Sequence, residues 1–162
     1  MLAASELDAI IGAIQPHCFG RSPHVARLFA DPGALERDYF RRTGIFPIMH
    51  TLVMKESLDA EHPWIAESLY KAFEEAKQWA LDHRQRLGAL RYMLPWLGEH
   101  LAEIDDLFGG DPWPYGLEAN RATLETFAGY LAEQGYLAMP PPIDDLFTPI
   151  VGQSQRGPRD RH

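Results

Sequence analysis

Apolar residues run almost without interruption from Thr43 to Lys55, and we expect this stretch to be the organising element of the chain. Its apolar positions are rich in branched side chains: Ile45, Phe46, Ile48, Leu52, Val53 and Met54. Such a continuous run is typical of a strand that is covered on both faces, as in an α/β protein. Pro47 lacks a backbone donor and therefore fits near the start of a strand or at a sheet edge. A short buried strand is also predicted at Ala9–Ile14.

Helical spacing of apolar residues predicts most of the remaining chain. Asp31 and Pro32 have the character of an N-cap and a first helical residue, and this helix should run to about Arg42 and stop at Gly44. The other predicted helical segments are the end of a helix at Leu2–Leu7, a short turn at Lys55–Glu61, a long helix that opens at His62-Pro63-Trp64, a helix at about Tyr92–Phe108, a helix at about Leu117–Gln134 and a short segment at Ile143–Phe147.

The segment Gly109–Gly116 is rich in glycine and proline and also carries Trp113 and Tyr115. This composition makes a poor flexible linker and a good rigid surface or cleft wall. Asn120 follows it and falls on the apolar stripe of the next predicted helix. A polar residue on such a stripe must find a partner, so Asn120 either ties two elements together or faces a ligand.

Composition and charge narrow the class of protein. The 162 residues suffice for one ordinary domain, and 46% hydrophobic with 23% charged residues is typical of a soluble globular protein. The net charge of -8 argues against a general nucleic-acid binder. The single cysteine excludes an internal disulfide, and no apolar run is long enough to cross a membrane. The first residues lack the features of a signal peptide, so we expect a cytoplasmic protein.

Three polar features are candidates for chemistry, and each also has a structural interpretation. His50, in the middle of the apolar run, is either a buried histidine bonded to backbone or a site residue that the strand holds rigidly. Arg41 and Arg42 either complement the dipole at a helix C-terminus or grip a carboxylate. His17 stands beside Cys18, but without a second cysteine or a matching histidine spacing we expect no metal site there.

Several blocks, taken in order, resemble the C-terminal half of the 4,5-dihydroxyphthalate decarboxylase family. They are Thr43–His50, His62–Trp64, Met93–Leu97, Trp113–Arg121 and Glu133–Gly135. The resemblance covers residues 1–150, and none of the blocks is a catalytic signature by itself. The family shares the type 2 periplasmic solute-binding fold, and some of its members are labelled transporter substrate-binding proteins.

The resemblance implies an α/β chain with a partial type 2 periplasmic-binding-protein-like fold that is helix-rich and has few strands. Residues 1–44 would be a remnant of the second lobe, and residues 45–150 the returning strand and C-terminal helices of the first lobe. Residues 151–162 are expected to form a disordered tail. Family members are much longer and carry an N-terminal lobe, so this chain is expected to form a homo-oligomer or to associate with the missing lobe.

The function implied by the resemblance is the non-oxidative decarboxylation of a dihydroxylated aromatic dicarboxylate. Such a reaction needs an acid near the ring carbon, a base near the phenol and a cation for the retained carboxylate. By residue type, His50 is the expected proton carrier, and Glu118 or His17 the expected base. The expected substrate-binding residues are Arg41, Arg42, Arg21, Trp113, Tyr115 and Asn120. We expect no metal and no other cofactor.

Two alternatives stay open. A solute-binding module for a small carboxylate would use the same arginines and aromatic residues but would need no proton donor. An inactive fragment of either protein is the third possibility. For the decarboxylase and for the solute-binding module, the expected partner is a small aromatic carboxylate. Neither a nucleic acid nor a membrane is expected as a partner.

Overall fold

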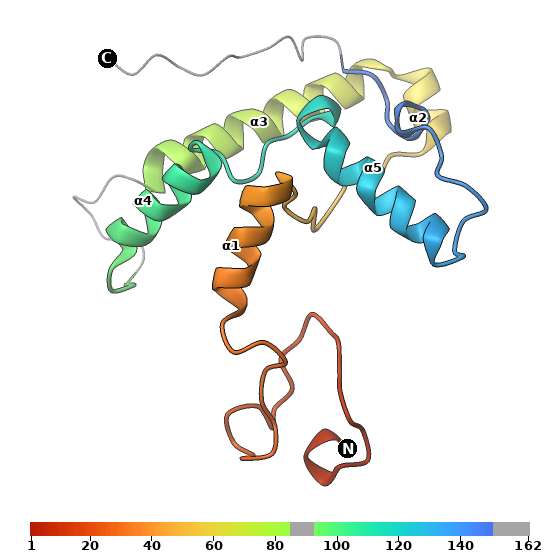
Figure 1. Ribbon diagram of the computed structural model, residues 1–162. Helices are drawn as coiled ribbons and strands as arrows, with labels where there is room; N and C mark the ends of the chain where they lie inside the picture. Colours follow the sequence, from red (N-terminus) through yellow and green to blue (C-terminus); the bar gives the residue numbers. More distant parts are fainter. Residues whose placement is uncertain (85–92, 151–162) are drawn as a thin grey trace. The chain divides into compact units, whose positions relative to one another are not determined.

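The computed structural model describes residues 1–84 and 93–150 of the chain. Within these residues, all regular secondary structure is helical (Figure 1). The elements, in chain order, are η1 (Leu2–Ala4), α1 (Pro32–Thr43), α2 (Glu56–Glu61), α3 (Trp64–Arg84), α4 (Leu97–Phe108), α5 (Leu117–Glu133) and η2 (Ile143–Leu146). The tail that was predicted at 151–162 lies outside the described residues.

The ends of α1 follow the local sequence signals. The Oδ1 atom of Asp31 accepts a hydrogen bond from the backbone N–H of Ala34 at 3.0 Å, which satisfies a donor that the helix itself leaves open. Pro32 is the first helical residue. Gly44 follows the helix with φ +67°, and its N–H donates to the carbonyl of Phe40 at 2.7 Å. The predicted start and stop of this helix are therefore confirmed.

Helix α4 begins later than its apolar pattern predicted. The predicted start at about Tyr92 lies outside the described residues, but the helix proper starts only at Leu97. Trp96 precedes it with φ +59°, and a residue in the left-handed region cannot continue a right-handed helix. The C-terminal end agrees with the prediction, because Gly109 closes the helix after Phe108.

Neither predicted strand forms within the described residues. Residues 9–14 and 45–54 have no regular secondary structure, and the part of the chain that the structure describes contains no strand with which the long apolar run could pair. Much of this run is exposed, including Leu52 at 65% and Val53 at 84%. The apolar pattern alone therefore misassigned these segments, while the α/β class and the lobe boundaries at 44 and 150 remain predictions.

The chain divides into two compact units, Met1–Asp38 and Tyr39–His162, with the division inside α1. In the first unit, a tight turn forms where Phe19 donates to the carbonyl of Pro16 and Ser22 donates to that of Cys18. The side chain of Arg27 lies 5.1 Å above the ring of Phe19. This unit is mostly loop, and its only helical residues are η1 and the first turns of α1 among the residues described.

In the second unit, α5 packs against η2. Ala128 on α5 and Ile143 on η2 are 5% and 6% exposed, and they are the buried apolar residues of the core among those that the structure describes. Many larger apolar side chains of this unit stay exposed. In the described part of the chain, no helix is both long and apolar enough to cross a membrane.

Candidate functional site

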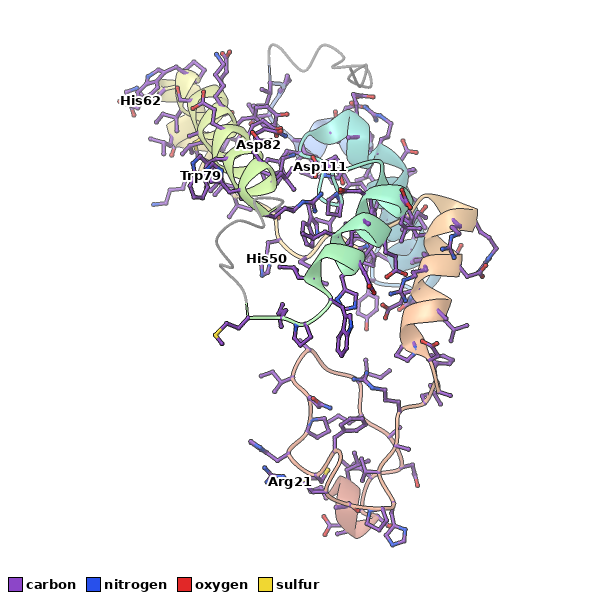
Figure 2. All side chains as sticks on the ribbon, turned by 90° about the vertical axis from the view of Figure 1, so that its left-hand side faces the viewer. Arg21, His50, His62, Trp79, Asp82 and Asp111 are labelled. Carbon is purple, nitrogen blue, oxygen red and sulfur yellow. The ribbon has the colours of Figure 1, made fainter. Side chains whose placement is uncertain are left out.

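The loop from Gly109 to Gly116 joins α4 to α5 (Figure 1). A lysine of α3 anchors it. The ammonium group of Lys77 lies 2.8 Å from Oδ2 of Asp111 and donates to the carbonyl of Trp113 at 3.2 Å. The same nitrogen lies 4.2 Å above the centre of the Tyr115 ring, a cation–π distance. One side chain thus contacts three residues of the loop. Figure 2 labels Asp111 in this loop.

Lys77 lies on the helix among charged residues, a position that normally indicates a solvated side chain, but its surroundings are different. Its side chain is only 10% exposed, and Glu74 on the same helix supplies a second carboxylate at 3.1 Å. Burial by itself lowers the pKa of Lys77, but the hydrogen bonds to Asp111 and Glu74 outweigh it and raise the pKa above its ordinary value. Lys77 is therefore a permanently charged anchor at neutral pH.

Arg84, the last residue of α3, anchors the start of the same loop. Its guanidinium forms an ion pair with Asp105 on α4 and donates to the carbonyl of Gly110 at 2.8 Å. Within the loop, Oδ1 of Asp111 accepts from the backbone N–H of Trp113 at 2.9 Å. The ion pair and the two hydrogen bonds fix the path of the backbone that leads to the two aromatic residues.

Asn120 holds the far end of the loop. Its Nδ2 group donates to the carbonyl of Pro114 at 2.7 Å and to that of Gly116 at 2.9 Å. Of the two roles that the sequence left open for Asn120, the structure shows the tie between elements. The loop carbonyls thus occupy both N–H donors of the amide.

Trp113 and Tyr115 are held by this framework while their rings stay accessible. Trp113 is 57% exposed and Tyr115 is 42% exposed. Behind Trp113 lies Phe46, with ring centroids 6.4 Å apart, and Phe46 packs edge-on against Phe108 at 5.1 Å. Phe40 completes the group at 4.5 Å from Phe108. We call Trp113 and Tyr115, with the loop that carries them, the aromatic wall.

Glu118, a candidate base, lies in the first turn of α5 and is ion-paired. The guanidinium of Arg121 contacts Oε1 of Glu118 at 2.6 Å and Oδ1 of Asp144 on η2 at 2.7 Å. The hydrogen bond from Arg121 lowers the pKa of Glu118 and, in the same way, that of Asp144, while the two carboxylates raise the pKa of Arg121. A lowered pKa makes Glu118 a weaker base, and its catalytic role remains a prediction.

Arg41 faces a hollow of about 660 Å³. The other residues that line this hollow all belong to α4: Glu99, Ala102, Glu103, Asp106 and Leu107. Glu99, Glu103 and Asp106 give this hollow three carboxylates against one arginine, a balance that disfavours the binding of a further anion. The neighbouring Arg42, in the last turn of α1, is exposed, and both arginines remain only predicted clamps.

The remaining candidates are placed in other segments. His50 is exposed on the segment that leads from α1 to α2, so the interpretation as a buried, backbone-bonded histidine is wrong (Figure 2). His17 and Arg21 are exposed in the first unit, and neither belongs to the unit that carries the aromatic wall. Among the residues that the structure describes, no group of three or more potential ligand side chains is placed to hold a metal ion.

The structure thus brings together Trp113, Tyr115 and Asn120 among the predicted site residues. Sequence analysis missed Lys77 and Arg84, the two cations that anchor the wall. A basic residue on a helix pattern normally indicates a solvated face, and the partners of these two lie 34 and 21 residues away along the chain. The only sequence signal was an acidic residue beside the aromatic positions in the loop, Asp111.

Comparison with known proteins shows a similarity to part of a longer enzyme. No protein-family model matches the chain. The 4,5-dihydroxyphthalate decarboxylase of Comamonas testosteroni is 38% identical to it over 128 residues. These residues make up 78% of this chain, which spans only 39% of the length of that protein. The chain is therefore a distant or partial relative of a 4,5-dihydroxyphthalate decarboxylase.

Proposed function

We propose that this chain forms part of a carboxy-lyase that removes carbon dioxide from a dihydroxylated aromatic dicarboxylate of the 4,5-dihydroxyphthalate kind, in the degradation of aromatic compounds. The observation that carries the proposal is the 38% identity over 128 residues to a protein of that name. The aromatic wall gives it physical support, because an exposed, backed pair of rings suits a planar aromatic ligand.

The chemistry assigns roles to the candidate residues. A deprotonated phenol para to the departing carboxylate pushes electrons to the ring carbon, which takes a proton from a general acid. The bond between the ring carbon and the carboxylate then breaks. Its electron pair returns to the ring, which restores aromaticity, and carbon dioxide leaves. His50 is the proposed acid because an imidazole ring can carry a proton and release it to a substrate. Glu118 or His17 is the proposed base, and the arginines bind the carboxylate that is retained.

We propose further that the active form is an assembly, either of several copies or with a polypeptide that supplies the rest of the fold. The exposed apolar run is the support for this proposal. Met49 is 74% exposed, Leu52 65% and Val53 84%, in a segment rich in branched residues without strand pairing. Surfaces of this kind are typical of interaction sites.

The test is a paired assay of binding and turnover. The chain is purified alone and also after co-expression with the portion of the Comamonas testosteroni decarboxylase that it does not match. Binding of 4,5-dihydroxyphthalate is measured by calorimetry, and carbon dioxide release by mass spectrometry.

Release of carbon dioxide that requires this chain supports the lyase. Binding without release would replace it with the solute-binding module, and neither binding nor release in any assembly would indicate an inactive fragment. The same chain with Trp113 replaced by Ala measures the contribution of the aromatic wall.

A further inference from the structure

The arrangement around Lys77 has a consequence for ligand recognition. Its ammonium group contacts Asp111, the carbonyl of Trp113 and the face of the Tyr115 ring at the same time. With a side chain that is 10% exposed, Lys77 is covered by the groups that it holds and offers little surface to a ligand. Its role is therefore different from that of a carboxylate clamp.

We propose that Lys77 is a positioning residue, which fixes Trp113 and Tyr115 as a rigid wall that selects planar aromatic carboxylates over non-aromatic ones. The identity of the ligand rests on the proposed function. The anchoring of the wall rests on the contacts of Lys77 and does not depend on that function. Specificity arises because stacking on the rings stabilises only an aromatic ligand. In addition, a wall that is already ordered loses little conformational entropy on binding.

Without Lys77 the loop keeps the hydrogen bonds from Arg84 and Asn120 at its ends. Its centre would lose the ion pair to Asp111, the hydrogen bond to the Trp113 carbonyl and the cation over Tyr115. We therefore expect the two rings to move while the helices at either end stay folded.

The experiment uses the full chain with 5-fluorotryptophan in place of its four tryptophans. The fluorine NMR spectrum of each variant is compared with that of the wild-type chain. The resonance of Trp113 is assigned with W113F. In K77M this resonance should shift or broaden, while those of Trp64, Trp79 and Trp96 stay in place. The control is K71M, because Lys71 lies on the same helix, is 66% exposed and pairs only with Glu67 among the contacts that the structure describes. K77R, which keeps the charge, should restore part of the native signal.

Binding is then measured by calorimetry with phthalate, an aromatic dicarboxylate without the hydroxyl groups, and with maleate, a non-aromatic one of similar carboxylate spacing. K77M should weaken phthalate binding by roughly three- to tenfold, the range that one lost ring contact implies, and leave maleate binding unchanged. A residue that only supports folding would weaken both ligands equally. If K77M does not fold, D111N provides the same comparison with the side-chain volume conserved.

An unchanged Trp113 resonance in K77M, or an equal loss for phthalate and maleate, overturns the inference. If the wild-type chain and its assemblies bind neither ligand, the proposed function and the selectivity are both wrong. A shifted Trp113 resonance in K77M would then support only the role of Lys77 in anchoring the loop. If phthalate binds and is affected as expected while no assembly releases carbon dioxide, the decarboxylase fails and the positioning role stands.

Discussion

Replacing Asn120 by Ala should destabilise the chain through the loop and not through the helix that carries Asn120. The amide donates two hydrogen bonds, at 2.7 Å to the carbonyl of Pro114 and at 2.9 Å to that of Gly116. Alanine is the better helix former, so the helix itself gains slightly from the change. The cost must then come from two carbonyls that lose their donor.

The magnitude follows from the two hydrogen bonds. A hydrogen bond between neutral groups contributes a net ~0.5–1.5 kcal/mol, so two of them contribute ~1–3 kcal/mol. The bond to Pro114 is exposed, and water can replace the lost donor there, whereas the bond to Gly116 is partly buried. We therefore expect a loss of about 1–2 kcal/mol in the free energy of unfolding.

Urea unfolding followed by circular dichroism measures this loss, with Glu125→Gln on the exposed face of the same helix as the matched control. Asn120→Asp keeps the shape of the side chain but replaces its donors with an acceptor, so it should cost at least as much as Asn120→Ala. A midpoint for Asn120→Ala equal to that of the control would refute the tie. A normal midpoint with weakened phthalate binding would indicate a direct ligand contact.

Three further predictions concern charge and association. Arg121 holds the pKa values of Glu118 and Asp144 below their ordinary 4.5 and 3.8, so the stability that they contribute is complete above those values and is lost as the pH falls below them. Arg121→Met should remove this acid-dependent part of the urea midpoint, and an unchanged pH profile would speak against the ion pairs. Arg42→Gln should weaken phthalate binding by roughly ten- to a hundredfold if Arg42 clamps a carboxylate. Arg41→Gln should have less effect because three carboxylates line the same hollow as Arg41. Equal calorimetric affinities for phthalate and its diamide would reject both clamps. The isolated chain should form oligomers or aggregates that bind the dye ANS, and a stable monomer without ANS binding in light scattering would contradict this.

Local signals were sufficient to predict where α1 begins and ends. The cap at Asp31, the proline after it and Gly44 are all close neighbours along the chain, and they bound α1 in the structure as predicted. The start of α4 was predicted too early because the apolar spacing continues through Trp96, while the backbone of that residue is left-handed. Periodicity reports which face is apolar, and it does not report the backbone angle of one residue.

The predicted strands show what a sequence pattern leaves out. An apolar, branched run indicates a segment that is suited to a sheet, but a strand requires a partner backbone, and no such partner lies among the residues described. The anchoring of the aromatic wall was not predictable for a related reason. Lys77 and Asp111 are 34 residues apart, and a single sequence does not show which lysine reaches which carboxylate.

The most direct test of the account is carbon dioxide release from carboxyl-labelled 4,5-dihydroxyphthalate by the chain and its assemblies, followed by the same assay on His50→Gln. Glutamine keeps a hydrogen-bonding side chain but cannot deliver a proton, so turnover should fall by about a hundredfold or more while substrate binding changes little. Circular dichroism of the variant confirms that it is folded. Labelled carbon dioxide from the wild-type assembly and its loss in His50→Gln are the results that we predict. An assembly that binds the substrate and releases no carbon dioxide would contradict the decarboxylase, and an active His50→Gln variant would contradict the assigned proton donor.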